Sequence, residues 1–207
     1  MDYEILTTFI GATLVLAIAP GPDNIYVFTQ SISNGRRNGL ATTAGLISGC
    51  LVHTTLLAFG VSAVLKANNR LFVFIKVFGA CYLIYLAWQT IRSKMTLPLT
   101  KDATSDKNLV RLFRQGFLMN VLNPKVTLFF IAFFPAFLFS DTMSPLLQFY
   151  VLGLLFMLVS AITFGSIAML AGSISDRLAG KVGIGSYVKW FQVVVLLSIA
   201  AYLLFSN

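Results

Sequence analysis

Residues 5–31 decide the fold, because they form an apolar run that two prolines interrupt. They read ILTTFIGATLVLAIAPGPDNIYVFTQS, with the interruption at Pro20-Gly21-Pro22. A helix needs about 20 mostly apolar residues to cross a hydrocarbon core about 30 Å thick, so the run is long enough for one span. A proline inside a helix removes a main-chain hydrogen bond and clashes with the preceding turn. The stretch therefore predicts a membrane helix in two halves.

A second apolar run, residues 116–139, is interrupted in the same way. It reads GFLMNVLNPKVTLFFIAFFPAFLF, in which Asn123 suits a helix N-cap and Pro124 suits the first helical position. One proline alone is as compatible with a kink as with a break. Two interrupted runs in corresponding places favour discontinuous helices, which are typical of transporters.

The composition of the whole chain agrees with a membrane protein. Of its 207 residues, 57% are hydrophobic and 11% are charged, whereas soluble chains are about 45–50% apolar and about 25% charged. The apolar runs are continuous, which does not fit a β-barrel. We predict an all-α membrane protein with one transmembrane domain over residues 1–207. Its six spans cover about residues 5–31, 40–65, 71–91, 116–139, 146–171 and 187–205.

The basic residues predict how these spans are oriented. Eleven Lys and Arg fall in the first, third and fifth loops or at their edges, and three fall on the opposite side. Cytoplasmic loops carry the excess of Lys and Arg, so both termini are expected on the non-cytoplasmic side. Two inverted three-helix halves follow, about 4–91 and 115–206, separated by a cytoplasmic loop at about 92–114. Broken spans one and four open the halves.

Asp23 and Lys125 are the only formal charges predicted deep inside spans. Each is costly there without a partner. Either the two side chains pair only with one another, or they flank a cavity for a small zwitterion. In the second case Asp23 binds the ammonium group, Lys125 binds the carboxylate, and Asn24, Asn120 and Asn123 supply neutral hydrogen bonds.

Other residues carry weaker signals. His53, the single histidine, is either a proton carrier or a hydrogen-bond partner for a neighbouring helix. Ala41, Gly45 and Gly49 form a ridge of small residues that predicts close helix packing. The residue types present supply no metal cluster and no Ser-His-Asp set. We therefore expect neither an enzyme, nor a metal or other cofactor, nor a nucleic-acid partner, and the glycine ridge permits a homodimer.

Three ordered motifs resemble the LysE/RhtB family of amino-acid exporters. They are PGPDN at 20–24 with SNGRRNG at 33–39, GACYLIYLAW at 79–88, and GFLMNVLNPK at 116–125 with FFP at 133–135. The resemblance covers essentially the whole chain. One departure is Cys50, which stands where many members carry an acidic residue.

The resemblance implies a multi-pass exporter of amino acids or close derivatives in the bacterial inner membrane, surrounded by lipid and driven by proton antiport. Asp23 and His53 are then the candidates for proton coupling. It leaves the substrate open among basic, neutral and hydroxylated amino acids. Two alternatives are a membrane thiol–disulfide electron carrier using Cys50 and Cys81, and a passive small-solute channel.

Overall fold

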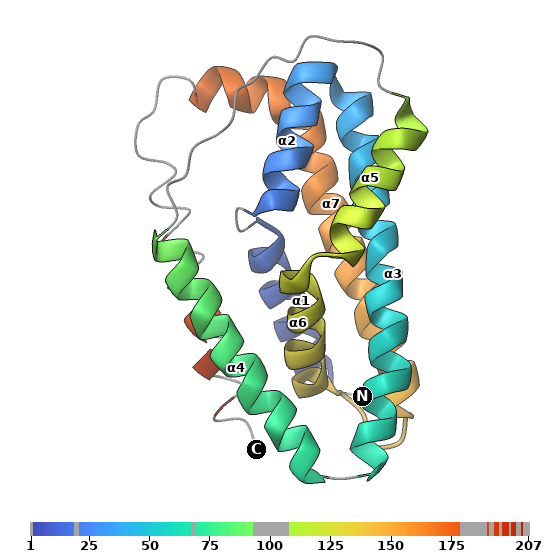
Figure 1. Ribbon diagram of the computed structural model, residues 1–207. Coiled ribbons are helices and arrows are strands. Elements are labelled where there is room, and N and C mark those ends of the chain that lie inside the picture. The colour runs from blue at the N-terminus through green and yellow to red at the C-terminus, as the bar shows by residue number, and fades with distance from the viewer. Residues whose placement is uncertain are drawn as a thin grey trace.

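The computed structural model describes residues 2–18, 21–67, 69–92 and 108–178 and parts of the segment 190–204. At some helical positions, among them Pro124 and Lys125, only the main chain is described. Within these ranges the regular structure is entirely helical (Figure 1). The elements are α1 (Tyr3–Ile18), α2 (Pro22–Asn34), α3 (Arg36–Ala67), α4 (Asn69–Arg92), α5 (Leu109–Val121), α6 (Pro124–Phe133), the 3₁₀ turn η1 (Phe134–Phe137) and α7 (Pro145–Leu178).

Two of the described helices are long and apolar enough to cross a membrane by themselves. They are α3, over Arg36–Val61, and α7, over Pro145–Ala171. The pair α1 and α2 passes the same test as one span bent by 58°. Many large apolar side chains on the outer surface are exposed, for example Leu56 at 65% and Ile162 at 61%. Such a surface suits contact with lipid tails better than contact with water.

Both predicted interruptions are present as gaps between helices. The first separates the end of α1 at Ile18 from the start of α2 at Pro22, and the predicted break residue Pro20 lies outside the described residues. The second separates α5 from α6 at Leu122 and Asn123. Helix α5 starts at Leu109, before the apolar run that was predicted to span the membrane from about residue 116. Both gaps lie near mid-height in Figure 1.

The glycine ridge of α3 packs closely against another helix, as the sequence predicts, and the structure shows that this helix is α5. A Cβ at Gly45 would overlap the main-chain oxygen of Phe113, and a Cβ at Gly116 would overlap the main-chain oxygen of Thr42. The two glycines therefore let the backbones of α3 and α5 touch. At the turn before α3, Gly35 has a φ of 87°, which residues with a Cβ rarely adopt.

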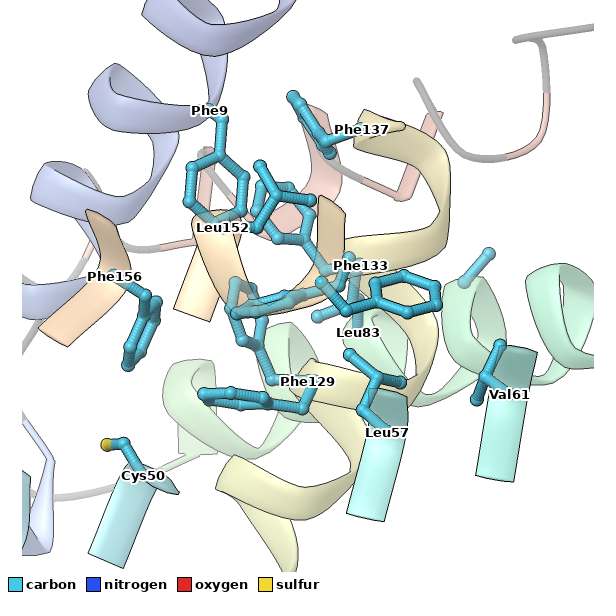
Figure 2. Close-up of a cluster of buried hydrophobic side chains, with 14 of the residues drawn as sticks. Phe9, Cys50, Leu57, Val61, Leu83, Phe129, Phe133, Phe137, Leu152 and Phe156 are labelled. Atoms are coloured by element: carbon cyan, nitrogen blue, oxygen red, sulfur yellow. The ribbon is translucent and has the colours of Figure 1, made fainter. Parts of the chain in front are cut away.

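A cluster of phenylalanines joins α1, α6, η1 and α7 (Figure 2). Along α6 and η1, residues four apart stack in pairs, with ring centroids 4.5 Å apart for Phe129 and Phe133 and 4.2 Å apart for Phe130 and Phe134. Phe9 of α1 packs against Phe133 at 5.6 Å and against Phe134 at 5.2 Å. The cluster thus fixes α6 against α1.

The charged ends of the helices separate into two groups. Figure 1 places the α2–α3 junction and the start of α5 at one end of the molecule, and these elements carry Arg36, Arg37, Arg111 and Arg114. At the other end, the main-chain N–H of Asp2 donates to Phe139 O at 2.9 Å. This bond brings the acidic start of α1 beside the loop that contains Asp141.

The contact between α3 and α5 predicts the effect of a single methyl group. In Gly45→Ala the new Cβ meets main chain, which cannot rotate away, so the two helices must separate. Overpacking of this kind costs about 1–3 kcal/mol, and we expect a lower thermal unfolding midpoint in detergent. Gly60→Ala in the same helix is the control, since a Cβ there meets nothing within 4 Å. Equal midpoints for the two variants would contradict the close contact.

Candidate functional site

The first gap is bridged by a side chain from the start of α2. In an unbroken helix the carbonyl of Ala17 would accept the N–H of residue 21. Here the side-chain amide Nδ2 of Asn24 donates to Ala17 O at 2.7 Å instead. Gly21 has an extended backbone and Pro22 holds the first turn of α2, so Asp23 lies at a helix N-terminus. The helix dipole favours a carboxylate at that position.

At the second gap, the main chain of Asn123 bonds to both of the helices that it separates. The N–H of Asn123 turns back to Asn120 O at 3.0 Å. Its carbonyl accepts the N–H of Val126 at 3.1 Å and the hydroxyl of Thr127 at 3.3 Å. Asn123 therefore occupies the N-cap position of α6, as the sequence predicts, and Pro124 is the first helical residue.

The two gaps face one another through their polar side chains. The amide Nδ2 of Asn123 lies 3.4 Å from both carboxylate oxygens of Asp23. These residues are a hundred positions apart in the chain. Both distances are long for hydrogen bonds, so the contact is one that a better donor can replace.

Lys125 lies in the first turn of α6, two residues after Asn123, but its side chain is outside the described residues. The predicted ion pair between Lys125 and Asp23 therefore also lies outside them. The structure brings together the other four predicted binding residues, Asp23, Asn24, Asn120 and Asn123, in the wall of one pocket. The predicted break residues Gly21 and Pro22 line it too.

This pocket has a volume of about 60 Å³. Since a cavity needs about 10–15 Å³ to hold one water, the space is of the order needed for a few non-hydrogen atoms. One part of its wall carries the carboxylate and the three amides. The remainder is mostly apolar and is formed by Leu16, Leu83, Val126, Phe129, Phe156 and Phe164.

Sequence reasoning missed part of this wall. Ser160 of α7 lines the pocket and is buried, but a single hydroxyl in an apolar span gives no signal by itself. Cys50 also lines it, and its thiol lies 3.8 Å from Asn120 Oδ1. The sequence did single out this position, because Cys50 stands where many members of the resembled family carry an acidic residue. The aromatic residues Phe129, Phe156 and Phe164 could not be told from ordinary core residues.

His53 lies outside this pocket, on the far side of Asn120. Its ring nitrogen Nε2 is 3.1 Å from Asn120 O of α5. This contact agrees with the interpretation of His53 as a hydrogen-bond partner for a neighbouring helix. His53 also lines a separate pocket of about 290 Å³, whose wall comes from α3 and α6. Within the described residues, no group of three His, Cys, Asp or Glu side chains is placed to hold a metal ion.

Comparison with known proteins gives one family. The family model described as LysE type translocator matches residues 14–207. The homoserine/homoserine lactone efflux protein of Salmonella typhimurium is 29% identical over 198 residues, 95% of each chain. The leucine efflux protein of Klebsiella pneumoniae is 27% identical over 172 residues, 83% of this chain and 80% of its own. A membrane protein of Vibrio cholerae is 32% identical over 173 residues, 83% of each chain. No solved structure matches.

The two cysteines give a test of the pocket wall that needs no substrate. Both are free thiols, Cys50 buried and Cys81 exposed on α4. We expect N-ethylmaleimide, a small uncharged reagent that can enter the detergent around the outer surface of α4, to add once to the detergent-solubilised protein, as measured by intact mass. The addition should persist in Cys50→Ala and disappear in Cys81→Ala. Fast modification of the Cys81→Ala protein would mean that Cys50 is open to solvent and would contradict its place in a buried pocket wall.

Proposed function

Because the chain belongs to the LysE type translocator family, we propose that it exports an amino acid, or a small zwitterionic derivative, across the bacterial inner membrane. The relatives named above as efflux proteins for homoserine or homoserine lactone and for leucine support an amino-acid substrate. The single observation that carries the proposal is the contact between Asp23 and Asn123, which joins two interrupted helices at one polar pocket.

The substrate's two charges have different partners in this proposal. Its ammonium group binds the carboxylate of Asp23 and replaces the long contact with Asn123. Its carboxylate binds Lys125 at the start of α6, where the helix dipole favours an anion. Asn24, Asn120 and Asn123 complete the hydrogen bonds. Lys125 then has a reason to lie at a helix N-terminus, a position that is otherwise unfavourable for a cation.

The apolar part of the pocket favours a neutral substrate side chain. Phe129, Phe156 and Leu83 line it, and a second charge placed against them would lose its hydration without gaining a partner. Homoserine and leucine, named for two of the relatives, both have uncharged side chains. We therefore propose a small neutral amino acid as the substrate.

We assign the driving force to proton antiport. Asp23 is the first candidate for proton coupling, because the same carboxylate can bind either a proton or the substrate's ammonium group. The second candidate, His53, does not line the substrate pocket. Competition between proton and substrate for one carboxylate would make the two move in opposite directions.

The proposed topology is six spans in two inverted halves. Its support is the repeated order of a broken pair followed by a long helix, α1 and α2 before α3, and α5 and α6 before α7. The arginines at the α2–α3 junction and at the start of α5 support a cytoplasmic location for that end. Both termini then lie on the non-cytoplasmic side, in one transmembrane domain surrounded by lipid. A homodimer is compatible with this arrangement.

The other candidate functions have less support. A thiol–disulfide carrier needs two cysteines that can meet. Here Cys50 of α3 lines the pocket beside the two gaps, whereas Cys81 is exposed on α4. A passive channel needs a continuous polar path. The wall of the described pocket is instead largely apolar, and both helix gaps point into it.

Substitutions at the two charged residues test the proposed binding site. In proteoliposomes loaded with labelled leucine or homoserine, Asp23→Asn and Lys125→Met should slow efflux roughly tenfold to a hundredfold, since each removes a hydrogen bond to a charged group worth about 1.5–3 kcal/mol. Asp141→Asn, in the exposed loop before α7, is the matched control and should transport normally. Normal efflux in both pocket variants, with insertion intact, would rule out this site.

An imposed pH gradient tests the coupling. Vesicles with an acidic interior should accumulate labelled substrate from outside, because protons leaving the lumen drive substrate inward through an antiporter. One pH unit is equivalent to about 1.36 kcal/mol, so a one-to-one exchange gives at most about tenfold accumulation. Nigericin should abolish it. Equilibration without accumulation would indicate a channel instead.

A further inference from the structure

Pro124 leaves a main-chain carbonyl without its helical donor. In a continuous helix the N–H of residue 124 would bond to the carbonyl of Asn120, but proline has no N–H. The carbonyl of Asn120 keeps one partner, the N–H of Asn123 at 3.0 Å. A carbonyl oxygen has two lone pairs, so the bond from Asn123 leaves a second position that a donor from another helix can use.

His53 fills that position from another helix. Its ring nitrogen Nε2 lies 3.1 Å from Asn120 O, and the side chain is 4% exposed. A carbonyl can only accept, so Nε2 must carry the hydrogen. In the neutral ring Nδ1 then carries the free lone pair. Nδ1 is buried and has no hydrogen-bond partner within the described part of the chain, so no described group stands ready to exchange a proton with it.

The same face of α3 holds Asn120 in two further ways. The thiol of Cys50 lies 3.8 Å from Asn120 Oδ1. Gly49 leaves room for the Asn120 side chain, since a Cβ at Gly49 would come within 2.8 Å of Asn120 Cβ. The end of α5 is therefore fixed against α3 at Asn120. Three residues later, Asn123 reaches Asp23 of the other half.

We infer that His53 is a positioning residue: its Nε2–H replaces the donor that Pro124 lacks and thereby holds Asn123 opposite Asp23. The inference rests on the proposed function, because it assigns His53 to the same binding site. It differs from the proton-carrier interpretation in a testable way. A positioning residue must donate at Nε2 and need not titrate.

Two amide substitutions separate these roles, because glutamine places its amide near the Nε2 position of histidine and asparagine places its amide near the Nδ1 position. Neither amide titrates. We expect His53→Gln to retain substrate affinity within about twofold. His53→Asn should lose one net hydrogen bond and weaken apparent affinity about five- to tenfold. His53→Leu, which fills the space without a donor, should resemble His53→Asn.

The measurements are the apparent KM for efflux, the size of accumulation under a fixed pH gradient, and the unfolding midpoint of each variant. Positioning predicts proton-driven accumulation in His53→Gln equal to that of the unchanged protein. Loss of accumulation in His53→Gln and His53→Asn alike, with stability retained, would overturn the inference and identify His53 as a proton carrier.

A spectroscopic test does not depend on transport. His53 is the only histidine of the chain, so ¹⁵N-histidine labelling gives one pair of imidazole signals. At pH 8 we expect the neutral tautomer protonated at Nε2, and Pro124→Ala, which restores the missing N–H, should weaken its hydrogen bond. A ring protonated at Nδ1 would refute the inference even in an active exporter. Absence of efflux with the expected tautomer would refute the proposed function alone.

Discussion

Main-chain polar groups set free inside a membrane have to be satisfied within the protein, and the rest of this structure depends on that constraint. A broken helix exposes carbonyls at the end of one half and N–H groups at the start of the next, and lipid can bind neither. Here the carbonyls of Ala17 and Asn120 are bound by side chains, those of Asn24 and His53 respectively. The N-termini of α2 and α6 begin beside the same pocket, which Pro22, Asp23, Asn123 and Val126 line.

Packing keeps the two gaps next to one another. On one side, Gly45 and Gly116 bring the backbones of α3 and α5 into contact, which leaves little freedom for α5 to slide. On the other side, the stacked phenylalanines of α6 hold Phe9 of α1. The glycine contact holds α5 and the aromatic contact holds α6, and these are the two consecutive helices of the second interrupted span. The pocket lies beside both contacts, since Asn120 of α5 and Phe129 of α6 line it.

Proline positions and charge made much of this arrangement predictable. Both gaps, the N-cap at Asn123 and the glycine contact follow from local rules that need only neighbouring residues. The grouping of Asn24, Asn120 and Asn123 with Asp23 was predictable because buried amides and acids need partners. The contributions of Ser160 and Phe156 were not, because α7 is apolar almost throughout and the face turned to the pocket depends on its rotation about its axis. Similarly, the side chain of Asn120 contacts the thiol of Cys50, whereas its main-chain carbonyl is bound by His53. The sequence could not distinguish these two roles.

The freed carbonyls at the two gaps are hydrogen-bonded in different ways, and the difference affects which helices can move together. The first gap is closed locally, since Asn24 is seven residues from Ala17 and both belong to the interrupted span itself. The second gap has a local bond from the N–H of Asn123 to Asn120 O, and in addition a bond from His53 of α3, a helix outside the interrupted span. A movement of α5 relative to α3 therefore strains the bond of His53, whereas α1 and α2 can move together without breaking theirs. Among the described residues, a movement that separates the two gaps acts on the contact between Asn123 and Asp23, whose 3.4 Å distances are long for hydrogen bonds. In the proposed function, an ammonium group that binds at Asp23 acts on that same contact, so occupancy of the pocket is tied to the relative position of the two gaps.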